Sequence, residues 1–206
     1  HCGPTHDAQG HGCGHNLFGT ACAYAGIAIA RALRDSDTPG QVVVYGCPAE
    51  ETLEGKVYMA RDGAFDGLDA VLTWHPHWGN YTRAGSTNAM DSMAFEFFGE
   101  SAHSARDPWN GRSALDGIEI MNYGVNMMRE HMIEEARIHY VIMDGGVAPN
   151  VVPSYGRVWY YVRAPKRTIV GELSERVRNC ARAGALASGT EMKETLLTAV
   201  YETLPN

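Results

Sequence analysis

RIHYVIMDGGVAPNVVPSYGRVWYYVR, residues 137–163, decides the fold of the second half of this chain. Its two ends, 137–143 and 156–163, are apolar segments of the length and composition of strands. Glycines and prolines separate them, which is typical of a loop. The stretch therefore predicts two strands that follow one another directly, without a helix between them.

Helices and further strands flank this pair on both sides. Residues 112–134 predict a long amphipathic helix, because apolar side chains recur there near helical spacing. A strand over 92–99 (SMAFEFFG) precedes this helix, and a helix over 168–187 and a strand over 192–202 follow the central pair. The order β-α-β-β-α-β is that of a ferredoxin-like sandwich.

The first half of the chain predicts a different layer. Residues 17–34 have the small, apolar composition of a buried helix, and 52–64 predict a short one. The apolar runs QVVVYG at 41–46 and DAVLTW at 69–74 predict buried strands. This alternation implies α/β architecture with a mostly parallel sheet, in which ligands bind at the carboxyl ends of the strands.

Composition bounds the class of protein. The chain has 206 residues, of which 45% are hydrophobic and 20% charged, as in a soluble globular protein of one or two domains. No apolar run approaches the roughly 20 residues that span a membrane. The net charge of −7 and the lack of a basic patch argue against nucleic acid. Five cysteines without a disulfide-like spacing favour a reducing compartment, and we expect a cytoplasmic protein.

Three short motifs carry ligand-type residues. GHGCGHN at 10–16 places Cys13 and His15 in a glycine-rich turn, which allows close backbone approach to an ion. CPAEE at 47–51 and TWHP at 73–76 place Glu51 and His75 at the ends of the predicted strands. Thiolate, imidazole and carboxylate are ligands that zinc and similar divalent metals prefer. Alternatively, Cys13 is an ordinary buried thiol, His15 a turn residue and His75 a cap of the sheet.

Glu50 stands directly before Glu51, and two adjacent carboxylates at a strand end point in different directions. One can ligate a metal while the other acts as general base on a water, which a bound cation makes nucleophilic near neutral pH. The alternative is a solvated pair in the first turn of a helix, where carboxylates are favoured.

These motifs, followed by SAHS at 101–104 and APNVVP at 148–153, resemble the dinuclear metal-dependent amidohydrolases. That family includes hydrolases of N-acyl amino acids and auxin conjugates, and more distantly carboxypeptidase G. The resemblance implies a metal-binding catalytic domain that includes residues 1–87. It implies a lid and dimerisation domain over 88–203 and a return to the catalytic domain at 204–206.

The resemblance also assigns roles around two divalent metal ions, zinc or manganese. It implies that Cys13 bridges the metals, that His15 and His75 hold one of them, and that Glu51 holds the other. Glu50 would be the general base that activates a metal-bound water. The implied reaction is hydrolysis of the amide bond of an N-acyl or N-aroyl amino acid.

Residues of the lid have implied roles as well. His103 resembles the histidine that reaches the partner's active site and stabilises the oxyanion. Asn150 and Arg163 resemble residues that contact the substrate's carbonyl and carboxylate, and we expect both to reach one ligand, within the chain or across the dimer. The implied partner is a second copy, with a related subunit as the alternative. Without the resemblance, His103 is a structural residue, and Trp159, Tyr161 and Arg163 form an ordinary sheet surface.

The chain departs from the family in length, since such enzymes are about twice as long. It resembles a central fragment, and the last metal-ligand histidine of the family has no counterpart here, so the second metal lacks a ligand. We therefore expect this chain alone to be inactive or nearly so. The alternative function is a catalytically incomplete dimerisation or binding fragment. Asn16 and Trp74 favour the p-aminobenzoyl-glutamate branch of the family. His139 is interpreted as a structural or surface residue.

Overall fold

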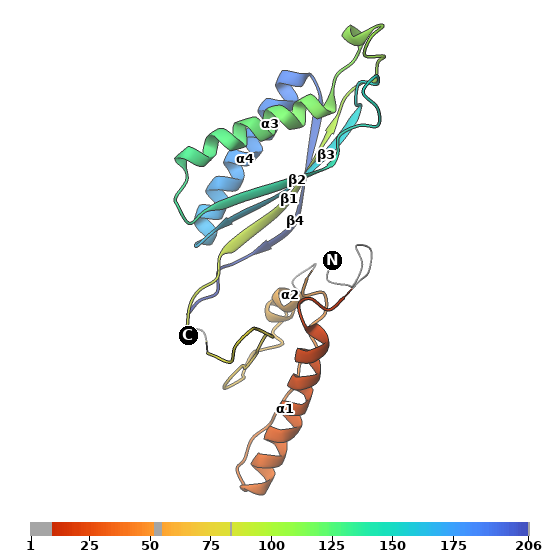
Figure 1. Ribbon diagram of the computed structural model, residues 1–206. Helices are drawn as coiled ribbons and strands as arrows, with labels where there is room; N and C mark the ends of the chain where they lie inside the picture. Colours follow the sequence, from red (N-terminus) through yellow and green to blue (C-terminus); the bar gives the residue numbers. More distant parts are fainter. Residues whose placement is uncertain (1–9, 52–54, 83, 206) are drawn as a thin grey trace. The chain divides into compact units, whose positions relative to one another are not determined.

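The structure is a computed structural model that describes residues 10–51, 55–82 and 84–205 (Figure 1). The chain divides into two compact units, His1–Arg83 and Ala84–Asn206, which we call unit 1 and unit 2. All strands of the described residues lie in unit 2, together with α3 and α4, whereas α1 and α2 lie in unit 1.

Unit 2 forms a 4-stranded antiparallel sheet with the strand order β2-β3-β1-β4. This order and the element order β-α-β-β-α-β confirm the predicted ferredoxin-like sandwich. The elements are β1 (Ala89–Phe98), η1 (Pro108–Asn110), α3 (Ala114–Met128), η2 (Arg129–His131), β2 (Arg137–Asp144), β3 (Tyr155–Ala164), α4 (Arg167–Ser188) and β4 (Glu191–Val200).

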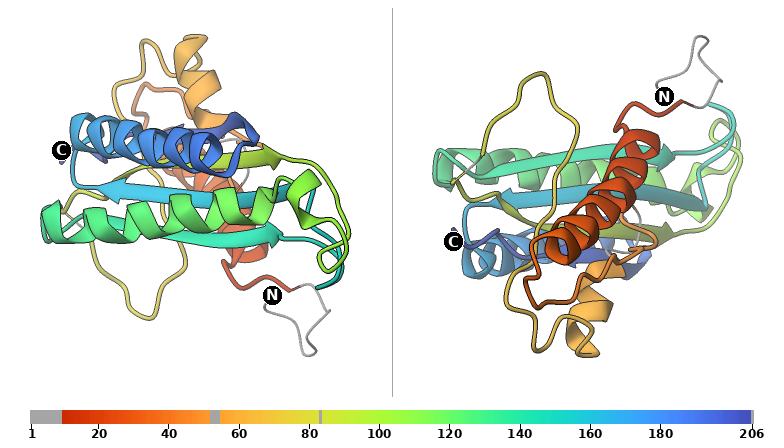
Figure 2. Two further views of the ribbon diagram at one scale, coloured as in Figure 1. Left: turned by 90° about the horizontal axis from the view of Figure 1, so that it is seen from above. Right: turned by 90° about the horizontal axis from the view of Figure 1, so that it is seen from below.

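The core of unit 2 lies between the sheet and the two helices, which run side by side over one face (Figure 2). Along β3, buried and half-buried residues alternate, so every second side chain points to the helices. The largest buried side chains come from both layers; they are Met93, Phe95, Phe97, Ile118, Met121, Val125, Val158, Tyr160, Val162, Val170 and Val177. The other set of β3 side chains lies on the opposite face, which we call the open face.

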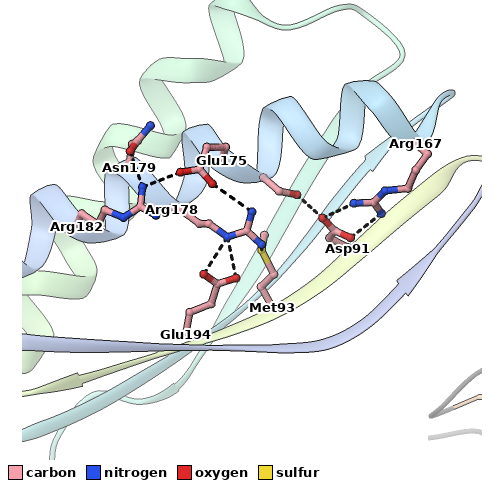
Figure 3. A network of polar contacts seen from close by, with 9 residues as sticks. Asp91, Met93, Arg167, Glu175, Arg178, Asn179, Arg182 and Glu194 are labelled. Atoms are coloured by element: carbon pink, nitrogen blue, oxygen red, sulfur yellow. Dashed lines mark hydrogen bonds and ion pairs between the residues drawn. The ribbon is translucent and has the colours of Figure 1, made fainter.

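Polar contacts fasten α4 to the sheet (Figure 3). Arg167 donates two hydrogen bonds to the Asp91 carboxylate, at 2.6 and 2.8 Å, and the Ser174 hydroxyl donates a third at 2.7 Å. Burial alone would raise the pKa of Asp91, but these hydrogen bonds and the charge of Arg167 lower it below its usual value. Further along the helix, Arg178 donates to both oxygens of Glu194 at 2.9 Å.

Unit 1 contains α1 (His15–Asp35) and α2 (Gly55–Arg61). α1 confirms the helix predicted over 17–34. α2 lies within the helix predicted over 52–64, of which 52–54 fall outside the described residues.

The strands predicted over 41–46 and 69–74 are wrong, because neither segment pairs in a sheet within the described residues. A parallel strand needs hydrogen-bonding neighbours on its edges, and the described part of unit 1 offers helices only. The segment over 41–46 instead packs against α1 and the turn that follows α2. Val44 lies against Gly26 of α1, and the Tyr45 hydroxyl donates to the Ala64 carbonyl at 2.7 Å.

The apolar face of α1 is largely uncovered, with Leu17, Tyr24 and Ile27 exposed. By length and composition α1 is long and apolar enough to cross a membrane, as core helices of soluble proteins also are, whereas the sequence led us to expect no such run.

Candidate metal centre and substrate site

Gly14 brings the two motif segments of unit 1 together. It begins α1 with a φ of 75°, in the left-handed region that favours glycine. A Cβ at this position would lie 2.8 Å from Cγ of Pro76, which is closer than side chains tolerate. Only glycine therefore allows the turn that carries Cys13 and His15 to approach the segment that carries His75.

The ligand-type side chains of unit 1 converge on one point. Sγ of Cys13 lies 3.1 Å from Nε2 of His75. Nε2 of His15 lies 2.9 Å from Oε1 of Glu51 and 3.4 Å from Oε2 of Glu50. Two overlapping groups result, Cys13–His15–His75 and His15–Glu50–Glu51, and the ligand atoms within each lie within 4.8 Å of one another.

Neighbouring groups orient these ligands. Nδ1–H of His75 can donate to the Pro76 carbonyl at 2.9 Å, which leaves the lone pair of Nε2 directed at Cys13. The Phe18 ring stacks on His75 and meets His15 edge-on, with ring centroids 6.0 and 4.9 Å apart. Hydrogen bonds from Cys13 and then His15 lower the pKa of Glu51, so its carboxylate is ionised and ready to act as a ligand.

The chemistry of this cluster fits a divalent metal. A thiolate, two imidazoles and carboxylates are the donor set of zinc sites. Oε2 of Glu50 is buried and accepts no hydrogen bond among the described residues, although Nε2 of His15 lies 3.4 Å away. A buried carboxylate oxygen without a donor is costly unless a cation or a proton compensates it.

His103 and Asn150 lie on adjacent loops of unit 2. The Ser104 amide donates to the Asn150 carbonyl at 3.0 Å, and His103 forms an isolated bridge with Val151. The Ala105 amide donates to Nδ1 of His103 at 3.3 Å, so a neutral imidazole carries its proton on Nε2. His103 is exposed and can therefore offer Nε2–H as a hydrogen-bond donor to another molecule.

Arg163 does not join these two residues. It lies near the far end of β3, paired with Met90, while Asn150 precedes the start of the strand at Tyr155. Eight strand residues at about 3.4 Å each separate Tyr155 from Arg163 by roughly 27 Å. The expectation that Asn150 and Arg163 reach one ligand within a single chain is therefore wrong, and only the version across a dimer stays a prediction.

Sequence reasoning overlooked His139. In β2 it pairs with Tyr161 and lies on the open face, diagonal to Arg163, whose own register partner is Arg137. Burial lowers the pKa of His139, and so do the charges of Arg163, Arg129 and Arg137. The sequence could place His139 and Arg137 on one strand face, but the neighbours of that face on β3 follow only from the strand register.

Unit 2 assigns the chain to a protein family. The peptidase dimerisation domain family matches residues 86–188, and the chain belongs to this family, M20. The site residues of unit 1 lie outside the matched range. The matched range contains β1, β2 and β3 of the sheet together with α3 and α4.

Among known proteins, the chain is similar to one of the p-aminobenzoyl-glutamate hydrolase subunits of Escherichia coli (strain K12), with 43% identity over 96% of this chain and 41% of the relative. It is also similar to the Xaa-Arg dipeptidase of Mus musculus, with 35% identity over 97% of this chain and 47% of the relative. The chain thus spans less than half the length of these two relatives.

Solved structures share the fold. One from methicillin-resistant Staphylococcus aureus has a TM-score of 0.71 at 20% identity and covers 93% of this chain and 54% of that one. The aminobenzoyl-glutamate utilization protein from Klebsiella pneumoniae has a TM-score of 0.53 at 21% identity and covers 63% of this chain and 35% of that one.

Proposed function

We propose that this chain is the metal-binding and dimerisation part of an amidohydrolase that cleaves the amide bond of an N-acyl or N-aroyl amino acid. The observation that carries the proposal is the convergence of Cys13, His15, Glu51 and His75 from three separate motifs. The hydrolase names of the relatives support the reaction type. Two divalent ions, zinc or manganese, are the proposed cofactors.

The residues of the chain divide the chemistry between them. Bound metals would supply Lewis-acid activation of water and of the scissile carbonyl. Cys13, His15, His75 and Glu51 would hold them. Glu50 accepts the proton of the attacking water, which suits its buried oxygen without a donor.

His103 is proposed to donate Nε2–H to the developing oxyanion. Asn150, on the neighbouring loop, would contact the carbonyl group of the same substrate. Arg163 would bind a free carboxylate, because its guanidinium has no hydrogen-bond or ion-pair partner within the described part of the chain. The distance along β3 between Arg163 and the loops of His103 and Asn150 favours a site to which two subunits contribute. The proposed type of substrate is p-aminobenzoyl-glutamate.

A second copy of the chain is the proposed partner, and one edge of unit 2 fits it. β2 is an edge strand, and Tyr140, Val141, Ile142 and Met143 are exposed along it. An apolar edge strand with unpaired backbone groups invites pairing with another strand.

The adjacent helix extends this surface. Ile120, Tyr123 and Met127 are exposed on α3 at spacings of three and four residues, which places them on one stripe. The opposite edge strand, β4, exposes Glu191, Lys193 and Thr195 in its first half and Leu196 and Leu197 in its second, so its apolar run is shorter than that of β2. We propose that the β2 edge and the α3 stripe form a two-fold interface. A reducing, cytoplasmic location remains part of the proposal.

A catalytically incomplete dimerisation or binding fragment is the second candidate. The observation that favours it is the coverage of 41% of the most similar hydrolase named above. The deciding experiment measures p-aminobenzoyl-glutamate hydrolysis in zinc or manganese, by this chain and by a version of the length of its relatives. Activity in the long version only, abolished by a chelator, supports the proposal, whereas activity in neither sinks it.

A further inference from the structure

The open face of the sheet in unit 2 carries a cluster of cations at one end. Arg163 of β3 lies opposite Arg137 of β2, and His139 lies opposite Tyr161, the second neighbour of Arg163. We propose that Arg163, His139 and Arg137 form one anion site, which receives the side-chain carboxylate of the amino-acid half of the substrate and thereby rejects basic amino acids. This inference rests on the proposed function and names His139 as a specificity-determining residue.

The cations at this end of the open face lack neighbouring carboxylates among the described residues that act on His139. Among the described residues, the charges that lower the pKa of His139 are those of three cations, Arg163, Arg129 and Arg137. Arg163 forms no ion pair within the described ranges, and its Nε is buried without a hydrogen bond. An arginine that is removed from water without a partner favours an incoming anion.

The other end of the same face gives an internal comparison. Arg157 lies on the same face of β3 as Arg163, six residues earlier in the chain. It is paired in register with Glu96 of β1 and Asp144 of β2, so carboxylates flank it on both sides. Nε of Arg157 is likewise buried without a hydrogen bond, so the difference between the two arginines lies in the flanking residues: carboxylates beside Arg157, and Met90 and Arg137 beside Arg163.

The surroundings hold Arg163 ready for a ligand. Its guanidinium lies over the Tyr161 ring, 5.2 Å from the centroid. The Trp159 ring meets Tyr161 edge-on at 5.3 Å, and its indole N–H donates to the Ser92 hydroxyl at 2.8 Å. These contacts restrict the rotamers of Trp159 and Tyr161, on which the Arg163 guanidinium packs. Less side-chain entropy is therefore lost when a ligand binds.

The donors match a single carboxylate. Arg137 donates to the carbonyls of Glu134 and Ala136, so it contributes charge rather than a free fork. Arg163 offers a fork and His139 a single N–H. Diagonal neighbours of a sheet lie about 7–8 Å apart, which is within reach of long side chains, so Arg163 and His139 can both donate to one carboxylate placed between them.

The charge of this site distinguishes between the amino acids named for two of the similar proteins. Their names point to glutamate in one case and to arginine in the other. A cluster of cations attracts the carboxylate of glutamate and repels a guanidinium, so the site predicts an acidic amino acid for this chain.

Binding of uncleavable probes to the full chain tests the inference. N-(4-aminobenzyl) derivatives of L-glutamate, L-glutamine and L-arginine replace the scissile amide by an amine, and isothermal titration calorimetry gives each Kd. We expect the glutamate probe to bind about tenfold to a hundredfold more tightly than the glutamine probe, as for a charge-assisted hydrogen bond. The arginine probe should bind most weakly.

Variants then assign the preference to residues. His139→Gln and Arg163→Gln should each reduce the preference for glutamate over glutamine, and His139→Glu should improve binding of the arginine probe. Arg157→Gln is the matched control and should keep the wild-type preference. An unchanged preference in His139→Gln, an equal loss in Arg157→Gln, or no binding of any probe overturns the inference. Selective binding without turnover sinks the proposed reaction alone, and turnover without selectivity sinks this inference alone.

Discussion

Cys13 and His75 are 62 positions apart in the chain, yet Sγ of one lies 3.1 Å from Nε2 of the other. Gly14 makes this approach possible, because any larger residue would meet the Pro76 ring. A thiol and an imidazole held at this distance, with His15 and two carboxylates beside them, are the contacts on which the proposed metal centre rests.

The two adjacent carboxylates should have different tasks. In the active protein, Glu50→Gln should lower kcat about 10²–10⁴-fold while the metal content survives, because a positioned base is lost. Glu51→Gln should instead lower the metal content. Elemental analysis and turnover of p-aminobenzoyl-glutamate are measured on both variants. If both lose metal equally, the division of labour between the two is wrong.

Gly14→Ala should damage the centre without touching a ligand. The positive φ costs an alanine about 1–2 kcal/mol, and its Cβ would collide with Pro76. We expect weaker zinc binding in competition with a chromophoric chelator. Gly19→Ala is the control, because Gly19 lies in α1 with nothing within 4 Å of an added Cβ. Equal zinc affinities of the two variants would contradict the role given to Gly14.

A charge placed on the proposed partner surface should separate two copies. Tyr123, 68% exposed on α3, and Val141 of β2 are suitable positions. Tyr123→Glu and Val141→Glu should shift the protein from dimer to monomer in light scattering after size exclusion, because a buried charge without a partner is costly. Leu186→Glu is the control, since Leu186 is 86% exposed on α4. A wild-type dimer that all three variants retain would rule out this interface.

Asp91 should stabilise unit 2 in a pH-dependent manner. It is 2% exposed and paired with Arg167, so Asp91→Asn should cost about 3–5 kcal/mol in urea unfolding. The exposed pair of Glu175 and Arg182 is the comparison, and Glu175→Gln should change the unfolding free energy much less than Asp91→Asn does, because solvent screens the exposed pair. A similar cost for both variants would contradict the special role of Asp91.

The pH dependence has a defined sign. The pKa of Asp91 is lower in the folded protein than in the unfolded chain, where it is about 3.9. The stabilisation is therefore fully present above about pH 4 and is lost as pH falls through the folded pKa. The difference in unfolding free energy between wild type and Asp91→Asn should shrink in acid and stay constant from pH 5 to 8.

The sequence predicted unit 2 well because its signals are local. Helical spacing over 112–134 and alternation over 156–163 are properties of single elements, and each is confirmed within a few residues by α3 and β3. The strands over 41–46 and 69–74 failed because an apolar run does not specify its hydrogen-bonding neighbours. Pairing depends on other segments, which a local pattern cannot provide.

The site shows the same division. Residue type and motif spacing were enough to select Cys13, His15, Glu51 and His75, which the structure brings together. Neither signal could reveal that Arg163 lies about 27 Å along the strand from the loop side of β3. His139 was overlooked because its significance comes from cations on neighbouring segments rather than from its own context.

Metal stoichiometry tests the central claim most directly. The protein is dialysed to equilibrium against zinc or manganese, and its metal content is determined by plasma mass spectrometry for wild type, Cys13→Ser and Cys22→Ser. Cys22 is the control, because it lies in α1 outside the two ligand groups. We expect at least one equivalent in wild type and in Cys22→Ser, and a clear loss in Cys13→Ser, where a thiolate ligand is replaced. Equal metal content in all three proteins would contradict the account.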